Sequence, residues 1–162
     1  MGLVGPGVQQ SGIDSTTWTD HTNVRPTMLE LLGLKDDYEH DGRVLIEALD
    51  KKVLPNTRFE HQKTTLQLGA LYEQLNAPFG QFAMDTLTAS TRGIASTDES
   101  VYNSIENAIQ DLTVERDALA SQIKAAFDAA AFNGQQIKER QAKDWIEQAQ
   151  SLIDQASALA NS

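Results

Sequence analysis

The feature that constrains the fold most is a long apolar stripe in the second half of the chain. Its members recur at alternating intervals of four and three residues, with one charged residue among them: Ile105, Ile109, Leu112, Arg116, Leu119, Ile123, Ala126 and Ala130. This spacing puts all of them on one side of a single helix. A matching stripe follows between residues 138 and 160: Ala142, Trp145, Ala149, Leu152, Ala156 and Leu159. Asn133-Gly134 offers a turn between the two, so the sequence predicts an antiparallel helical hairpin with coiled-coil spacing.

Arg116 is the one charged residue in the first stripe. The aliphatic stem of an arginine can cover apolar surface while its guanidinium reaches water, so we interpret Arg116 as a structural residue rather than a binding residue. Ser96 and Glu99 have the spacing of a capping box, which predicts that this helix begins there.

Two further helices are predicted upstream of this hairpin. The first runs from about Arg58 to Asn76, and the second from about Pro78 to Ile94, where the proline fits a first helical turn. Apolar residues recur at helical spacing in both segments: Leu68, Leu71, Tyr72 and Leu75 in the first, and Phe79, Phe82, Ala83, Met84 and Leu87 in the second. We therefore expect a mostly α fold, in which residues 57–162 form an antiparallel bundle of about four helices.

Charge and composition exclude several classes of function. The chain has 13 Lys and Arg against 23 Asp and Glu, a net charge of −10, which disfavours binding to nucleic acid through a positive field. It has no cysteine, so disulfides, thiolate zinc sites and cysteine nucleophiles are excluded. No apolar run approaches the roughly 18 residues of a membrane span.

The N-terminal third contains a candidate ligand next to a helix start. Thr22 and Asn23 can cap a helix whose first turn contains Pro26 and whose end is marked by Gly33. His21 precedes this cap, in a loop where ligands are often bound. Asp20 could orient the His21 imidazole or could cap the loop, and the sequence leaves both roles open. Residues 2–8 fit either a short strand or a loosely packed tail, and the sequence predicts a short helix at residues 43–49.

Several motifs in this segment resemble a known pattern. Residues 19–22 read Thr-Asp-His-Thr, residues 25–27 read Arg-Pro-Thr, and a Leu-rich turn then ends at Gly33. Residues 41–45 read Asp-Gly-Arg-x-Leu, and residues 3–8 contain Gly-Pro-Gly. This order resembles the C-terminal end of the catalytic domain in the alkaline phosphatase and sulfatase superfamily, above all its phosphodiesterase and nucleotide pyrophosphatase-like members.

The resemblance implies a fold and a function for residues 1–56. They would be the C-terminal remnant of an α/β phosphoesterase domain, and His21 would be the last ligand of a two-metal site, usually zinc, that binds a phosphate or sulfate ester. Where many relatives carry Asp, this chain has Asn23. The nucleophile and the other ligands would come from an upstream part of the same domain, so we expect the 162-residue chain to be inactive alone. Relatives of this kind are often exported.

The alternative is a self-standing helical structural or interaction module without catalysis. Residues 57–162 would then be the functional part, and the N-terminal segment a passive arm. Other candidate sites are weaker: the acidic loop at residues 35–42 lacks the alternating spacing of a calcium-binding EF-hand loop, and His40 and His61 lie in polar surroundings. The sequence shows no phosphate-binding loop and no nucleophile motif of a known hydrolase.

Overall fold

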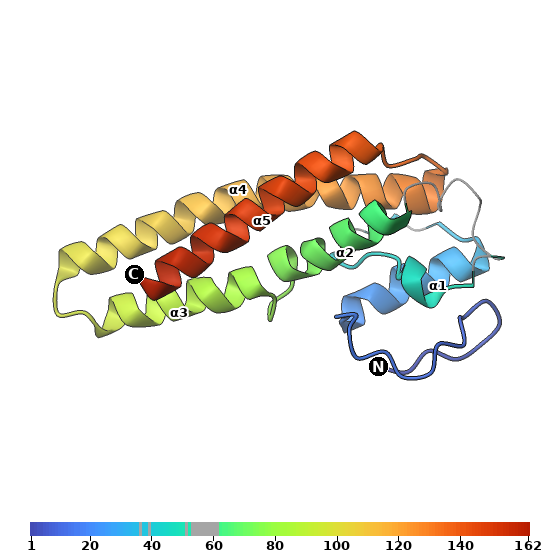
Figure 1. Ribbon diagram of the computed structural model, residues 1–162, viewed down its shortest axis with the longest axis horizontal. Coiled ribbons are helices and arrows are strands. Elements are labelled where there is room, and N and C mark those ends of the chain that lie inside the picture. Colours follow the sequence, from blue (N-terminus) through green and yellow to red (C-terminus); the bar gives the residue numbers. More distant parts are fainter. Residues whose placement is uncertain (36, 39, 51, 53–61) are drawn as a thin grey trace. The chain divides into compact units, whose positions relative to one another are not determined.

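The computed structural model describes residues 1–35, 37–38, 40–50, 52 and 62–162 (Figure 1). These residues form two short 3-10 helices and five α-helices: η1 (His21–Asn23), α1 (Val24–Leu32), η2 (Ile46–Ala48), α2 (Gln62–Asn76), α3 (Gln81–Ala95), α4 (Glu99–Asn133) and α5 (Glu139–Asn161). The prediction of a mostly α, bundle-forming chain is confirmed. The predicted boundary between residues 56 and 57, and the predicted helix start at Arg58, lie outside the described residues.

The contacts divide the chain into two compact units. Unit 1 comprises Met1–Ala70 and Ile123–Lys143, and unit 2 comprises Leu71–Gln122 and Asp144–Ser162. The division falls within α2, α4 and α5, because each of these helices has residues in both units.

Helix α1 in unit 1 ends as the sequence predicts. Gly33 has a φ of 65°, in the left-handed region that glycine adopts without strain. The N–H of Gly33 donates to the carbonyl of Glu30, and the N–H of Leu34 donates to that of Leu29 at 2.9 Å. These bonds satisfy carbonyls that the helix end would otherwise leave unpaired, so Gly33 is a genuine helix stop.

The predicted strand at residues 2–8 is reduced to one bridge in the part of the chain that the structure describes. Val8 and Leu49 form an isolated antiparallel bridge. On either side of it, the N–H of Gln9 donates to the carbonyl of Ala48, and the N–H of Asp50 donates to that of Gly7, both at 2.8 Å. The predicted helix at residues 43–49 is only the 3-10 turn η2. The N-terminal α/β remnant therefore stays a prediction.

A small apolar cluster links the loop after α1 to the end of α4 within unit 1. Val44, Leu49 and Ala131 are buried, and Leu31, Ile46 and Phe132 pack against them. The turn after α4 uses Gly134 at a φ of 67°, as predicted, with the N–H of Gln135 donating to the carbonyl of Ala129. This cluster holds the segment of residues 43–49 in place.

Unit 2 packs α3 against the first part of α4 and the last part of α5, which run side by side in Figure 1. The side chain of Ser90 donates to the Glu106 carboxylate at 2.8 Å, and Arg92 donates to the carbonyl of Ala160. The buried apolar residues of unit 2 come from α3, α4, α5 and the end of α2 with the turn after it: Tyr72, Leu75, Ala77, Phe82, Ala89, Leu119, Ala120, Trp145, Ala149, Leu152, Ile153, Ala156 and Ala160.

Arg116 in α4 contacts α3 and α2. The guanidinium of Arg116 lies over the ring of Phe82, 5.4 Å from its centre, and its Nη1 is 3.5 Å from Oδ1 of Asn76. A Cβ added to Gly93 would lie 3.5 Å from Ile105. Both contacts are internal to unit 2, in line with the structural interpretation of Arg116.

Two predicted helix starts are wrong. Helix α4 begins at Glu99, where the carboxylate of Asp98 accepts hydrogen bonds from the N–H and hydroxyl of Ser100 at 2.8 and 2.7 Å. Asp98 therefore caps this helix in place of the predicted pair Ser96 and Glu99, and these bonds lower the pKa of its carboxyl group. Helix α3 begins at Gln81 rather than Pro78, because a tight turn at Gly80 leaves the proline before the helix.

None of the helices in the described ranges is both long enough and apolar enough to span a membrane.

Candidate functional site

His21 lies on an exposed turn whose backbone is fixed by its neighbours. It is the first residue of η1, and its side chain is exposed. Asp20 caps this turn: its Oδ1 accepts from the N–H of Thr22 at 2.7 Å and from the Thr22 hydroxyl. Of the two roles that the sequence left open for Asp20, the observed one is loop capping. The His21 side chain is thus exposed on a turn whose backbone is held by the Asp20 cap.

The end of this turn is connected to residues 43–45 by buried polar groups. Asn23 is fully buried, and its Oδ1 accepts from the N–H of Arg43 at 3.3 Å. The hydroxyl of Thr27 donates to the carbonyl of Asn23 at 2.6 Å and accepts from the N–H of Leu45 at 3.0 Å. Buried polar groups that satisfy one another in this way fix a unique arrangement. The predicted helix-capping role of Asn23 is not observed, since its side chain makes no capping bond to α1.

Gly42 brings the two segments into direct backbone contact. A Cβ at this position would lie 2.0 Å from the carbonyl oxygen of Thr22 and 2.6 Å from the N–H nitrogen of Asn23. The φ of Gly42 is not in the left-handed region. Glycine is therefore required here for close approach of two backbones, rather than for the conformational freedom of a bend.

Arg43 is a buried residue with internal partners. Only 3% of its surface is exposed, and its guanidinium donates to both carboxylate oxygens of Glu47, at 3.0 and 2.6 Å. Nη1 also donates to the carbonyl of Val44 at 3.3 Å. The guanidinium lies close to α2, because a Cβ on Gly69 would be 2.9 Å from its central carbon. This bidentate pair stabilises the segment that carries Gly42.

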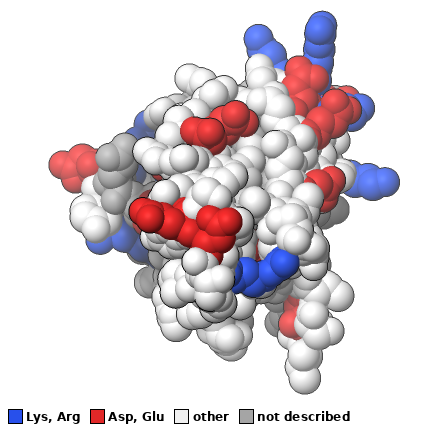
Figure 2. Space-filling view, turned by 90° about the vertical axis from the view of Figure 1, so that its left-hand side faces the viewer, with Lys and Arg blue, Asp and Glu red and all other residues white. Residues whose placement is uncertain are grey.

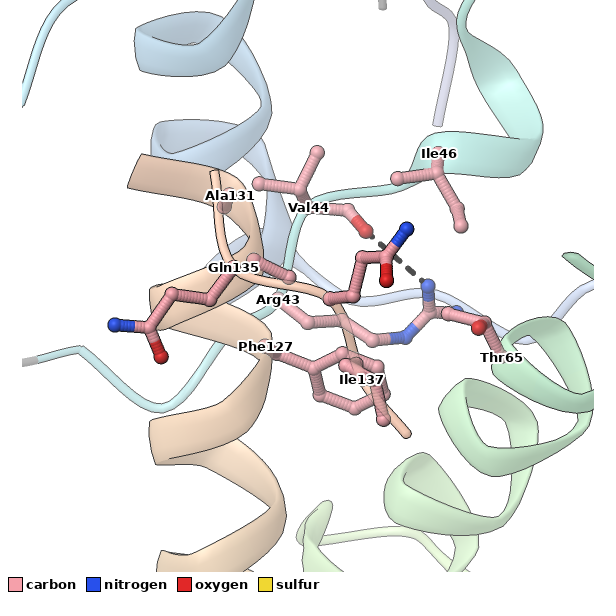
Figure 3. A pocket seen from close by; sticks show the side chains of 10 residues that line it. Arg43, Val44, Ile46, Thr65, Phe127, Ala131, Gln135 and Ile137 are labelled. Atoms are coloured by element: carbon pink, nitrogen blue, oxygen red, sulfur yellow. Dashed lines mark hydrogen bonds between the residues drawn. The ribbon is translucent and has the colours of Figure 1, made fainter. Parts of the chain in front are cut away.

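A small cavity lies beside Arg43, between α4 and the loop that follows it (Figure 3). Its volume is about 40 Å³, which is room for one or two waters but not for a substrate. Val44, Phe127 and Ile137 give it apolar walls. Since the Arg43 guanidinium is already paired with Glu47, we do not assign an anion site to this cavity.

The other histidine within the described ranges contacts the backbone of Gly42. His40 is half-buried, and its Nδ1 lies 3.1 Å from the carbonyl oxygen of Gly42. His61 lies outside the described residues. Within the described ranges, no group of three or more His, Cys, Asp and Glu is positioned to hold a metal ion.

A polar turn precedes the His21 segment. The carboxylate of Asp14 accepts from the N–H and hydroxyl of Thr16 and from the N–H of Thr17. Hydrogen bonds from Thr17 and Thr16 hold the pKa of Asp14 well below its usual range. Because these bonds are local and the carboxylate is exposed, Asp14 shapes the turn and is not a candidate acid or base.

Sequence reasoning missed the residues that hold the site together. One had a local signal: Thr27 follows Asn23 by four residues, the spacing at which a helical threonine reaches a backbone carbonyl. The contact between Asn23 and Arg43 joins residues twenty positions apart, and no local sequence signal indicated it. Comparison of the chain with protein-family models, with curated proteins and with solved structures finds no match.

Proposed function

We propose that residues 1–50 supply the metal-binding histidine His21 to the active site of a metal-dependent hydrolase of phosphate or related esters. The remaining ligands and the nucleophile are assigned to an upstream part of the same domain. The helices after residue 61 buttress this segment, and the metal is a divalent ion, with zinc the first choice.

The observation that carries this proposal is the contact between the two motifs on which the family resemblance rests. Gly42 packs on the carbonyl of Thr22 with no room for a side chain, and Arg43 donates to Asn23. A histidine on a turn with this support has a defined backbone position, which a metal ligand requires. The buried pair of Arg43 and Glu47 stabilises the segment that carries Gly42.

The chemistry of His21 fits the role of a single metal ligand. An imidazole nitrogen suits zinc, and the exposed His21 side chain makes no hydrogen bond within the described ranges that would have to be broken. A bound divalent ion would stabilise charge on the phosphoryl group and activate a nucleophile. The chain's own contribution is to hold one ligand in position and to exclude alternative conformations of the turn.

The test uses the protein encoded by the complete reading frame that contains these 162 codons. His21→Gln is expected to lower the bound zinc, measured by elemental analysis, and to reduce hydrolysis of bis(p-nitrophenyl) phosphate by at least about 100-fold, because loss of a ligand displaces the ion. The matched control is His40→Gln, which changes the same residue type at a half-buried position.

Two results would contradict the proposal. One is a His21→Gln protein that keeps its full metal content and activity. The other is an upstream reading frame without an Asp-His pair and without an earlier Ser or Thr and Asp, since the other ligands and the nucleophile would then be missing.

A second candidate function, a helical interaction module without catalysis, is favoured by the apolar surface of α3. Large apolar side chains near and on this helix are exposed, with Phe79 at 77%, Leu87 at 61% and Ile94 at 70%. Surfaces of this kind mark interaction sites when they are contiguous. The module would have to fold alone, so the purified chain is expected to show a helical circular dichroism spectrum and one cooperative urea transition. A gradual, non-cooperative loss of signal would argue against a self-standing module.

A further inference from the structure

The turn after α4 contains the single Asn-Gly pair of the sequence, Asn133 and Gly134. Asn133 is the last residue of α4, and both residues are exposed. In such a pair, the backbone nitrogen of the glycine can attack the side-chain amide carbon of the asparagine, because the glycine has no side chain that obstructs the approach. The contacts around the pair then determine how readily this attack occurs.

The attacking nitrogen of Gly134 is available. Within the described ranges, its N–H donates no hydrogen bond to a carbonyl, whereas the N–H of the next residue, Gln135, donates to the carbonyl of Ala129 at 3.1 Å. Gly134 has a φ of 67°, and no atom lies within 4 Å of the position that a Cβ would occupy. The glycine is thus neither held by a hydrogen bond of its N–H nor shielded from water.

A cation contacts the amide oxygen on which charge develops during this attack. The Nζ of Lys35 donates to Oδ1 of Asn133 at 2.9 Å, and both residues belong to unit 1. Attack on the amide carbon moves electrons onto Oδ1, so the hydrogen bond from the ammonium is stronger in the transition state than in the ground state. A contact of this kind accelerates the reaction. The two residues are 98 positions apart, so the contact depends on the folded chain.

We propose that Asn133 is a site of spontaneous deamidation, accelerated by Lys35, which converts the asparagine to an acidic residue. The backbone nitrogen of Gly134 forms a bond to Cγ of Asn133, the bond from Cγ to the side-chain nitrogen breaks, and the proton lost by the backbone nitrogen completes the ammonia that leaves. Water then adds to one of the two carbonyl carbons of the resulting cyclic imide and opens its C–N bond, giving aspartate or isoaspartate. Water is the one co-reactant, and this inference rests on neither of the functions proposed above.

The charge that this reaction creates has a partner in place. The chain has a net charge of −10, and acidic side chains form several groups on the face shown in Figure 2. A further carboxylate without a counter-charge would add to their mutual repulsion. Beside Lys35, a carboxylate at residue 133 instead replaces a hydrogen bond by an ion pair between the segment after α1 and the end of α4.

Ageing of the purified 162-residue chain at physiological pH and temperature tests the proposal. Peptide mass spectrometry after increasing times measures the conversion of each asparagine, because replacement of the side-chain amide by a carboxyl group changes the mass. Asn133 is expected to convert faster than Asn103, which lies inside α4 and precedes Ser104.

The role of Lys35 is tested by Lys35→Met, which removes the ammonium and keeps an apolar stem. In the folded chain, this change should slow the conversion of Asn133 about two- to fivefold, the effect of one exposed charge contact. In urea, the unfolded variant and the unfolded parent should convert Asn133 at the same rate, because the contact is absent. The matched control is Lys52→Met, which removes the same charge at another exposed lysine of unit 1 and should leave the rate unchanged. Urea unfolding curves verify that both variants are folded.

Three results would overturn the proposal. The first is conversion of Asn133 no faster than that of Asn103, which would refute the modification site. The others are a folded Lys35→Met chain that converts as fast as the parent, and a Lys35→Met chain that is slowed equally in urea. Either of these would show that the contact between Lys35 and Asn133 does not accelerate the reaction.

Discussion

Replacing Gly42 by alanine tests whether the two motifs around His21 are packed against one another. The added Cβ would lie 2.0 Å from the carbonyl oxygen of Thr22, whereas an ordinary contact between carbon and oxygen is about 3.3 Å. The backbone must therefore retreat by about 1.3 Å, which also breaks the hydrogen bond from Arg43 to Asn23. Overpacking costs about 1–3 kcal/mol and a lost buried hydrogen bond about 1 kcal/mol, so we expect a loss of about 2–4 kcal/mol.

Urea unfolding followed by circular dichroism measures this loss. Gly2→Ala is the matched control, because no atom lies within 4 Å of the added Cβ, and it should change stability by less than about 0.5 kcal/mol. Gly33→Ala separates backbone strain from contact: it also has open space, but its φ of 65° predicts a loss of about 1 kcal/mol. If Gly42→Ala were as stable as Gly2→Ala, the close approach on which the candidate site depends would be refuted.

Three further expectations follow from individual residues. Arg116→Leu should change stability by less than about 1 kcal/mol, because a stacking contact with Phe82 is exchanged for apolar burial; a loss above about 3 kcal/mol in urea unfolding would reveal a buried charge partner. Asp98→Ala should lower the urea midpoint at pH 7, since Asp98 caps α4. The bonds from Ser100 lower the pKa of Asp98 in the folded chain, so this cap stabilises the chain above the unfolded pKa and is lost as the pH falls through the folded value. The difference between variant and parent should thus shrink below about pH 4, and a constant difference would contradict the capping role. The purified 162-residue chain should not hydrolyse nitrophenyl phosphate or sulfate esters; a chelator-sensitive activity that copurifies with it would contradict the assignment of the nucleophile to an upstream part.

The elements that sequence reasoning predicted well are those with a local cause. The stop of α1 at Gly33 and the turn at Gly134 depend on one residue type that adopts a positive φ. The apolar residues that recur at alternating intervals of four and three predicted α4 and α5 over most of their lengths. The start of α4 was missed because Ser96 and Asp98 both qualify as caps, and only the backbone geometry selects Asp98.

The candidate site was predictable only in part, because its support is not local. His21 and the helix start after it were found from adjacent residues, and the exposed turn agrees with that expectation. The burial of Asn23 and the pairing of Arg43 with Glu47 depend on how segments twenty residues apart fold together. The reason for glycine at position 42 is likewise a contact with Thr22 that no short motif reveals.

The closeness of Arg43 to Gly69 limits how the two positions can change in evolution. A methyl group on residue 69 would lie 2.9 Å from the guanidinium carbon, so the guanidinium would have to shift while it is held by its pairing with Glu47. A larger residue at 69 is therefore favoured by a shorter side chain at 43. Changing Arg43 or Glu47 alone would break their bidentate pair, in which the arginine is only 3% exposed. In diverged sequences, we therefore expect positions 43, 47 and 69 to vary together.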